Sequence, residues 1–540
     1  MSALLAATQH LVLPKIAYLS IMPVLILIGG AAGILAVSAL WRRQLPAVAG
    51  TTLASLVAGG AIVASLVQWA DVRNHGPHLA IDGAVVQDGF SALISILVTV
   101  AVLLALLVAD TWMRREQVGG PELQVLMLVS AAGAVVMGQA NDLIVVFLGL
   151  EIMSIALYVL AAFNARRQES GEAGLKYFVL GSFSSAVFVY GIALVYGATG
   201  TSNLPQITDY LARNVLLHQG LLLAGVALLL VGFAFKVAAV PFHLWTPDVY
   251  QGSPTPVTGF MAAIAKAGGF AALLRVFVSS FGTLRSDWKP AVWLVAVLTL
   301  VLGAVVAVVQ RDVKRMLAYS SINHAGFVLL GLQAASSRGV EAALYYLFTY
   351  SFMVVGSFGV ITLVGGTGDR AHDLEDYRGL SRRAPGLAVA LAVLLLAQAG
   401  VPFTTGFLAK LEVVSAAVGA GSNALAVIAM VSAAIAAFFY LRVVFLMYSN
   451  PAGAPASATV EGSSSADVTR PSGALLLAAG DGPAATAPAA VIVGQGGAAG
   501  QPIPSGATVA IWLCIGVTVL FGLWPGPLTG FAHVARLILP

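Results

Sequence analysis

Residues 221–245 read LLLAGVALLLVGFAFKVAAVPFHLW, an apolar stretch whose exceptions are Lys236, Pro241 and His243. About 20 apolar residues suffice for a helix to cross the hydrocarbon core of a bilayer, which is about 30 Å thick. Proline interrupts a helix because it has no N–H group and clashes with the preceding turn. A charge in the middle of such a helix is costly and is therefore usually functional. The stretch predicts a membrane-spanning helix that is broken at Pro241 and carries a buried lysine.

Similar apolar runs recur along the whole chain of 540 residues, from Leu19 to near Leu523. Charged residues make up 9% of the sequence, whereas a soluble domain has about 25%. The sequence therefore predicts an all-α polytopic membrane protein. An apolar window predicts about fourteen transmembrane helices, which begin near Leu19, Ala47, Phe90, Leu123, Leu143, Tyr177, Leu221, Val257, Ala291, Val313, Ala342, Gly386, Ala424 and Val509. Between the fourth and fifth, Asn141 or Asp142 is expected to cap the following helix.

The basic residues predict the orientation, since cytoplasmic loops carry an excess of lysine and arginine. If the N-terminus lies outside the cytoplasm, the cytoplasmic connections hold Arg42, Arg43, Arg114, Arg115, Arg166, Arg167, Arg311, Lys314, Arg315, Arg370, Arg378, Arg382 and Arg383. The opposite connections hold fewer, among them Arg73, Arg213, Arg285, Lys289 and Arg338. We therefore expect both termini outside the cytoplasm.

The composition argues against several other classes of protein. The net charge is +4 and the basic residues come in short pairs between apolar runs, which does not indicate nucleic-acid binding. Cys514 is the single cysteine, so the chain has no internal disulfide and no cysteine cluster for zinc or iron–sulfur. No Gly-rich nucleotide loop follows a strand, and His243 and His324 are too isolated to suggest a metal site. We expect no cofactor and no metal on this chain.

The sequence predicts an internal repeat. Ala239-Val240-Pro241-Phe242 in the seventh predicted helix is echoed by Gly400-Val401-Pro402-Phe403 in the twelfth. Helices 4–8 (residues 122–281) and 9–13 (residues 282–449) would be two five-helix units of opposite orientation, following three helices in residues 1–121. Inverted repeats with broken helices at the functional site are common in transporters. The alternative is two ordinary kinks of chance similarity.

Residues 450–505 are rich in Ala, Gly, Ser and Pro and nearly free of bulky side chains. Such a composition cannot bury enough apolar area to offset chain entropy. We expect these residues to be a disordered cytoplasmic insertion. The last helix would follow it, in residues 506–540. A docking segment for a partner is the alternative.

Five ionisable residues lie inside predicted helices, most of them near mid-membrane: Glu151, Lys236, Lys266, His324 and Lys410. A charge at the centre of one inserted helix costs about 2.5–3.5 kcal/mol. The set would cost on the order of 10 kcal/mol if it faced lipid, as much as the net stability of a domain. The residues must face one another or water, where small rearrangements switch groups between charged and neutral forms. A proton relay is predicted; for any one residue the alternative is a structural ion pair or a side chain that reaches the headgroups.

Three further features are weaker signals. Lys176, near the start of the sixth predicted helix, fits either the relay or a contact with headgroups. Ser320 lies four residues before His324 and therefore shares its helix face, where it could extend a hydrated path. Trp245 and Tyr250 lie near a predicted boundary and are expected to be interfacial anchors.

Three segments resemble one known family. They are residues 245–258 (WTPDVYQGSPTPVT), residues 314–326 (KRMLAYSSINHAG) and residues 400–410 (GVPFTTGFLAK). All three are similar to the antiporter-like membrane subunits of bacterial NADH–quinone oxidoreductase (respiratory complex I), and to the subunit N family in particular. The similarity extends from about residue 19 to 447 and resumes in the last helix. The insertion at 450–505 is longer than the usual connection in that family.

The resemblance implies a function. It implies proton translocation driven by NADH oxidation and quinone reduction, with the NADH, FMN, iron–sulfur and quinone sites in partner subunits. Glu151 and Lys236 would form a modulating pair, Lys266 and His324 the central relay, and Lys410 the group on the exit side. Subunit M and the small subunits K and J are expected neighbours in the bilayer of the bacterial plasma membrane. The alternatives are a subunit of a cation/proton antiporter, a related membrane-bound hydrogenase complex, and a structural scaffold.

Overall fold

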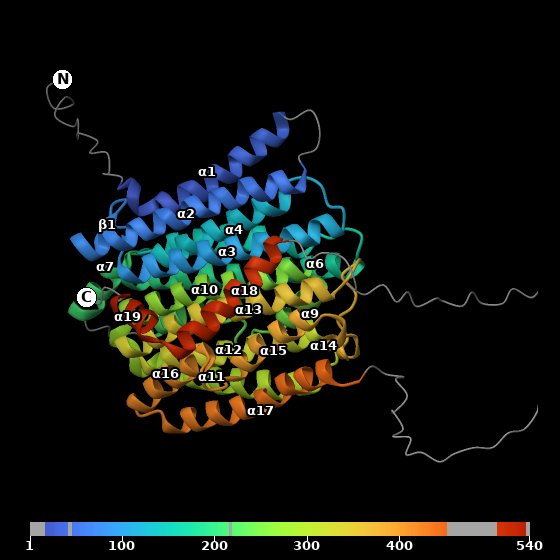
Figure 1. Cartoon of the computed structure of the whole chain (residues 1–540). Coiled ribbons are helices and arrows are strands. Elements are labelled where there is room, and N and C mark those ends of the chain that lie inside the picture. The colour runs from blue at the N-terminus through green and yellow to red at the C-terminus, as the bar shows by residue number, and fades with distance from the viewer. Residues whose placement is uncertain (1–16, 41–45, 215–218, 451–504, 536–540) are drawn as a thin grey trace, which may run out of the picture.

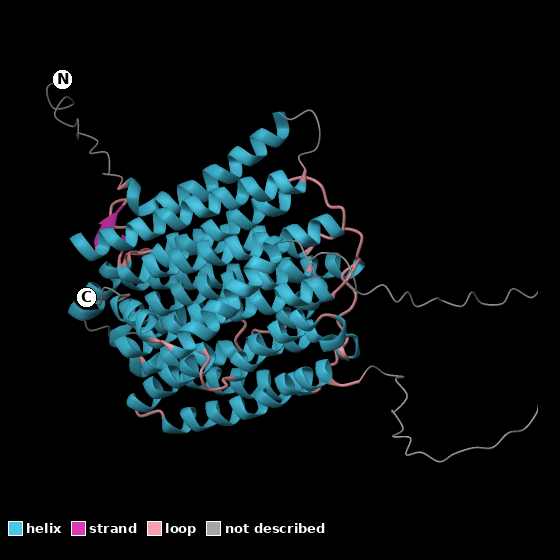
Figure 2. Cartoon of the chain, in the orientation of Figure 1, coloured by secondary structure: helices cyan, strands magenta, loops and turns pink. Residues whose placement is uncertain are grey.

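The structure is a computed structural model that describes residues 17–40, 46–214, 219–450 and 505–535. Arg42, Arg43, both chain ends and the predicted insertion, apart from its first and last residues, lie outside these ranges. The described part is a bundle of helices whose axes run roughly side by side (Figure 1). Strands occupy one short hairpin at one end of the described bundle, β1 His78–Ala80 paired antiparallel with β2 Val85–Gln87 (Figure 2).

The helices fall into groups that follow the chain. The first group is α1 Tyr18–Leu40, α2 Ala47–His75 and α3 Gly89–Arg115. The second is α4 Glu122–Gln139, α5 Leu143–Ala161, α6 Gln168–Thr199, α7 Leu204–Arg213, α8 Gly220–Lys236, α9 Trp245–Gly252 and α10 Thr255–Leu274, with the π-helix η1 Arg275–Ser280 and the 3-10 helix η2 Gly282–Leu284. The third is α11 Arg285–Val308, α12 Val313–Ala334, α13 Ser337–Val364, η3 Leu374–Tyr377, α14 Leu380–Arg383, α15 Pro385–Ala399, α16 Thr405–Gly419 and α17 Asn423–Tyr448. The last is α18 Ser505–Leu523 and α19 Gly526–Val534.

In the described residues, 11 helices are long and apolar enough to cross a membrane, and α8 and α15 are shorter apolar helices. The predicted all-α polytopic class is confirmed. Most helices begin within two residues of the predicted position, but α6, α11 and α13 begin five or more residues earlier. Their first turns carry polar or charged residues such as Glu169, Arg285 and Arg338, which an apolar window leaves out although a helix accommodates them.

Asp142 caps α5, as the sequence predicts. Its side chain accepts a hydrogen bond from the backbone N–H of Ile144 at 2.8 Å. The predicted break between α4 and α5 therefore lies at residues 140–142. Asp88 caps α3 in the same way, by accepting from the N–H of Ser91 at 2.8 Å.

One end of the bundle holds most of the basic connections; we call it the basic end. There the buried carboxylate of Asp369, in the loop after α13, accepts hydrogen bonds from the N–H and hydroxyl of Thr255 at the start of α10. It lies 3.8 Å from Nζ of Lys314 and 3.6 Å from Nη1 of Arg167. This carboxylate therefore links α10, the start of α6 and the start of α12.

The electrostatics of Asp369 follow from these neighbours. Burial raises the pKa of this carboxyl, but the Lys314 ammonium and the His372 imidazole lower it more, and Thr255 also donates to the charged form. The net pKa lies well below the usual range for aspartate. Asp369 is therefore ionised and paired at neutral pH.

Candidate functional site

Two helices of the bundle are interrupted in the middle. α8 ends at Lys236 and α9 begins at Trp245, with Pro241 in the non-helical segment between them. α15 ends at Ala399 and α16 begins at Thr405, with Pro402 in between. Both predicted breaks coincide with non-helical segments. The last carbonyl groups of a helix have no partner within it and carry the negative end of the helix dipole.

A lysine lies at each of these carbonyl ends. Nζ of Lys266, on α10, donates to the carbonyl oxygen of Val237 at 3.3 Å. Nζ of Lys410, on α16, donates to the carbonyl oxygens of Gln398 at 2.9 Å and Ala399 at 2.7 Å. The broken helices thus provide backbone acceptors for these two lysines, which form no ion pair with a carboxylate in the described ranges.

Lys236 is the last residue of α8 and is 3% exposed. Its Nζ donates to Oγ of Ser154 at 2.8 Å and lies 3.4 Å from Oη of Tyr177. Its neighbour Val237 accepts the hydrogen bond from Lys266. Lys236 and Lys266 therefore converge on the carbonyl end of α8.

Glu151 reaches Lys236 only indirectly. In the described residues the two form no ion pair; instead the hydroxyl of Ser185 on α6 donates to the Glu151 carboxylate. Ser185, Ser154 and Lys236 all line a cavity of about 10 Å³, roughly the volume that the centre of one water molecule needs. Glu151 and Lys236, the expected pair, are thus separated by two serines and by a space for about one water molecule.

His324 lies in a cluster of tyrosines. Its Nδ1 is 2.6 Å from Oη of Tyr346 and its Nε2 is 3.0 Å from Oη of Tyr440. The hydroxyl of Ser320 contacts the same Tyr440 oxygen, so Ser320 and His324 share a face and a partner. The two tyrosines were not predicted as site residues, because they come from α13 and α17, whereas their partner His324 lies on α12.

Lys410 is 6% exposed and lies close to the His324 helix. Its Nζ is 5.1 Å from the ring centroid of Phe327, which follows His324 by one turn on α12. Lys266, His324 and Lys410 have no hydrogen bond or ion pair to one another in the described part of the chain. The five predicted residues, which we call the row, lie on helices from α5 to α16 and form no hydrogen bond or ion pair with one another in the part of the chain that the structure describes.

Lys176 lies away from this row, near the basic end. Its Nζ is 2.7 Å from both Glu172 and Asp248. The other Asp248 oxygen is 2.7 Å from Nη1 of Arg315 on α12. Asp248 thus bridges two cations from different parts of the chain and was not predicted as a site residue.

The expectation that Trp245 and Tyr250 are interfacial anchors is wrong. Each is 2% exposed. Trp245 stacks on Tyr177 with a centroid distance of 4.4 Å and donates to the carbonyl of Phe235 at 3.0 Å. Because α9 folds back against α6 and α12, these rings pack inside the bundle beside Lys236 instead of at its rim.

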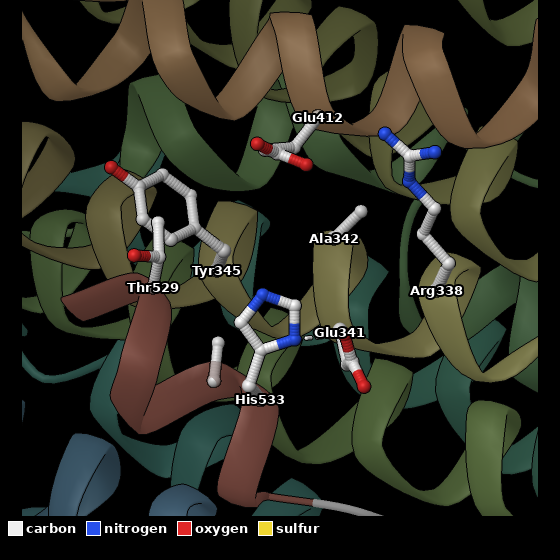
Figure 3. Close-up of a pocket in the computed structure, with 8 residues that line it drawn as sticks. Arg338, Glu341, Ala342, Tyr345, Glu412, Thr529 and His533 are labelled. Carbon is white, nitrogen blue, oxygen red and sulfur yellow. Dashed lines mark ion pairs between the residues drawn. The ribbon is translucent and has the colours of Figure 1, made fainter. Parts of the chain in front are cut away.

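A polar cavity lies at the end opposite the basic end. Its volume is about 440 Å³ and its lining consists of Arg338, Glu341, Ala342, Tyr345, Glu412, Thr529, Ala532 and His533. Figure 3 shows the His533 imidazole on α19 directed at Glu341 on α13. Nδ1 of His533 lies 2.6 Å from Oε2 of Glu341. Glu412 lies two residues beyond Lys410 on α16. No group of three His, Cys, Asp or Glu residues in the described ranges could hold a metal ion.

Comparisons with known sequences agree on one family. A family model described as NADH:quinone oxidoreductase/Mrp antiporter, TM, matches residues 140–436. NADH-quinone oxidoreductase subunit N of Trichlorobacter lovleyi is 44% identical over 368 residues, covering 68% of this chain and 76% of the relative. The subunit N of Parafrankia sp. is 42% identical over 471 residues, covering 82% and 88%.

Solved structures give the same result. A chain of respiratory complex I from Thermus thermophilus with bound aureothin superposes with a TM-score of 0.74 at 30% identity, over 95% of this chain and 100% of that one. A chain of the Mrp complex from Dietzia superposes with a TM-score of 0.78 at 20% identity, over 97% of each, which is a likeness of fold alone. The chain therefore belongs to the NADH-quinone oxidoreductase subunit N family, the antiporter-like membrane subunits of complex I.

Proposed function

We propose that this chain, as subunit N of a bacterial NADH–quinone oxidoreductase, transfers protons across the membrane along this row. The row runs through Glu151, Lys236, Lys266, His324 and Lys410. Redox chemistry takes place in partner subunits, which carry the NADH, FMN, iron–sulfur and quinone sites.

The observation that carries this proposal is the placement of Lys266 and Lys410 at the carbonyl ends of α8 and α15. A helix C-terminus favours a cation by typically 0.3–1 kcal/mol at the surface and about 2 kcal/mol in buried sites. The larger value is close to the cost of about 2.5–3.5 kcal/mol for a charge at the centre of an inserted helix. A small shift of either broken helix therefore changes which form, ammonium or amine, is the more stable. Such a balance is what proton uptake and release require.

Hydroxyl groups lie beside two parts of the row. Ser185 and Ser154 lie between Glu151 and Lys236. Tyr346 and Tyr440 flank His324. Hydroxyls both donate and accept, so each can pass a hydrogen-bond chain onward when water enters.

The polar cavity beside α16 suggests where the path leaves the bundle. Lys410 and Glu412 are on the same helix, and the buried Oη of Tyr345 has no hydrogen-bond partner among the described residues. Buried unpaired hydroxyls are normally satisfied by water. We propose that protons reach the outer side through this cavity and enter from the basic end, near Asp248.

The topology that we propose has about fourteen membrane crossings, with two inverted repeats at residues 122–281 and 282–449 and both termini outside the cytoplasm. A broken helix is the fourth crossing of each repeat. Lys266 and Lys410 do not occupy equivalent positions in the repeats, since one belongs to the helix after the break and the other to the second half of the broken helix itself. Subunits M, K and J are the neighbours that we propose in the plasma membrane.

The test is proton pumping driven by NADH in everted membrane vesicles, normalised to NADH:quinone activity. Lys410→Met and Glu151→Gln should lower pumping, while Arg213→Gln, an exposed cation on α7, should not. Intact pumping in Lys410→Met would support the scaffold alternative. Purification of the chain without flavin and iron–sulfur proteins would support the cation/proton antiporter.

A further inference from the structure

A second cavity lies where α11 begins and α12 ends, at the end opposite the basic end. Its volume is about 560 Å³. Its lining consists of Arg285, Ser286, Lys289, Pro290, Trp293 and Gln333. None of these residues takes part in the proposed relay.

Two cations at this cavity have no ion-pair partner among the described residues. Arg285 and Lys289 form no ion pair in the described part of the chain. They lie in the first two turns of α11, where the positive end of the helix dipole makes a cation unfavourable. Asp287, between them in sequence, accepts a hydrogen bond from Ser286 at 3.4 Å and does not line the cavity. An anion in the cavity would pair with both cations.

Gln333 supplies an independent indication of a ligand. It is 5% exposed, lines the cavity, and its Oε1 has no hydrogen-bond partner among the described residues. Buried amide oxygens nearly always have a donor. A ligand with a hydroxyl group next to its anionic group would provide one.

The surface beside the cavity is apolar. Trp293 is at the cavity wall, and an exposed aliphatic stripe starts at the next residue of α11, with the exposed fractions Leu294 54%, Leu298 40%, Val301 44% and Val305 49%. The spacing of three and four residues places these side chains on one helix face. α11 belongs to a helix long and apolar enough to span the membrane. The stripe therefore runs from the cavity into the depth of the bilayer.

We propose that this cavity binds the headgroup of an anionic phospholipid that carries hydroxyl groups, such as phosphatidylglycerol. Arg285 and Lys289 hold the phosphate, Gln333 accepts a hydrogen bond from a headgroup hydroxyl, and the acyl chains lie along the Leu294–Val305 stripe. A free phosphate ion shares the first of these contacts. The stripe and Gln333 favour the lipid.

The test uses the purified complex in detergent with the full chain. Bound phosphatidylglycerol is counted by mass spectrometry. After delipidation, the affinity of the complex is measured separately for phosphatidylglycerol, phosphatidylcholine and inorganic phosphate by titration with each. Arg285→Gln/Lys289→Gln should weaken phosphatidylglycerol binding about tenfold or more and remove one retained lipid. Arg213→Gln is the matched control, an exposed cation at the same end of the bundle, and should retain it.

Two further variants keep the result interpretable. Lys289→Gln alone should give a partial loss if the double variant fails to assemble. Gln333→Leu should weaken phosphatidylglycerol while leaving any response to phosphate unchanged. Equal lipid counts in the double variant and Arg213→Gln, equal binding of phosphatidylcholine, or a response to phosphate alone would overturn the proposal. The proposal is also overturned if a neighbouring subunit covers the cavity in the assembled complex.

Discussion

Nζ of Lys410 lies 2.7 Å from the carbonyl oxygen of Ala399, the last residue of α15. The lysine stem passes over Gly400, whose backbone has a φ of +91°. A methyl group at Gly400 would lie 3.1 Å from Cδ of Lys410. The break in the helix, the glycine and the cation therefore form one local structure.

Gly400→Ala should disturb this structure. The left-handed backbone disfavours alanine by about 1–2 kcal/mol, and the added methyl group pushes the Lys410 stem from its carbonyl partners. We expect a lower melting temperature of the complex and reduced proton pumping relative to NADH oxidation. Gly386→Ala is the control, because a methyl group there meets no atom within 4 Å. Normal pumping in Gly400→Ala would show that the position of Lys410 is not critical.

Lys236→Arg should separate charge from proton exchange. Arginine keeps the cation but does not readily lose its proton, and the adjoining cavity of about 10 Å³ leaves little space for a larger head. We expect pumping to fall about tenfold or more while the complex still assembles, as judged by co-purification of its subunits. If Lys236→Arg pumps normally, proton release at this position is refuted.

Tyr440→Phe should test the tyrosine cluster. The change removes the hydroxyl that joins Ser320 to His324 but keeps the ring, which packs against Phe439 with a centroid distance of 4.4 Å. We expect about tenfold slower pumping with NADH:quinone activity retained. Tyr448→Phe, on the same helix and 50% exposed, is the control. Equal pumping in both variants would exclude Tyr440 from the path.

Asp369→Asn should destabilise the basic end. It removes the carboxylate that faces Lys314, and loss of one partner of a buried ion pair costs about 3–5 kcal/mol. We expect a lower melting temperature of the complex. Exposed Glu375→Gln, in η3 of the same connection, is the control and should change the melting temperature little.

The effect of Asp369 should depend on pH in a defined direction. The pKa of the folded carboxyl lies below that of the unfolded chain, which is about 3.9. Its stabilisation is therefore fully present above that pH and is lost as the pH falls through the lower folded-state pKa. The difference in melting temperature between wild type and Asp369→Asn should stay constant from about pH 8 to pH 5. A difference that disappears within this range would contradict the pairing.

The sequence predicts much of this fold for physical reasons. Because lipid requires apolar side chains, the helices are visible in the sequence as apolar runs. Because proline cannot continue a helix, the predicted breaks at Pro241 and Pro402 coincide with the segments between α8 and α9 and between α15 and α16. Buried charges are rare in membranes, so Glu151, Lys236 and Lys266 stand out.

Other parts of the site leave no such trace in the sequence. Lys266 and Lys410 are held by backbone carbonyls, which every residue has. Ser185 and Tyr440 are common residues whose role depends on which helix packs opposite them. Trp245 has the composition of an interfacial anchor but lies inside the bundle because α9 folds back, a tertiary effect.

The most direct test is an experimental map of the intact complex in a lipid bilayer, at a resolution that shows ordered water. We predict a continuous series of waters and hydroxyls that joins Glu151 to Lys236, and then Lys266, His324 and Lys410 in turn. If these residues instead lie in dry, separate contacts, with apolar side chains filling the spaces between them, no proton can pass along the row and the proposed mechanism is contradicted.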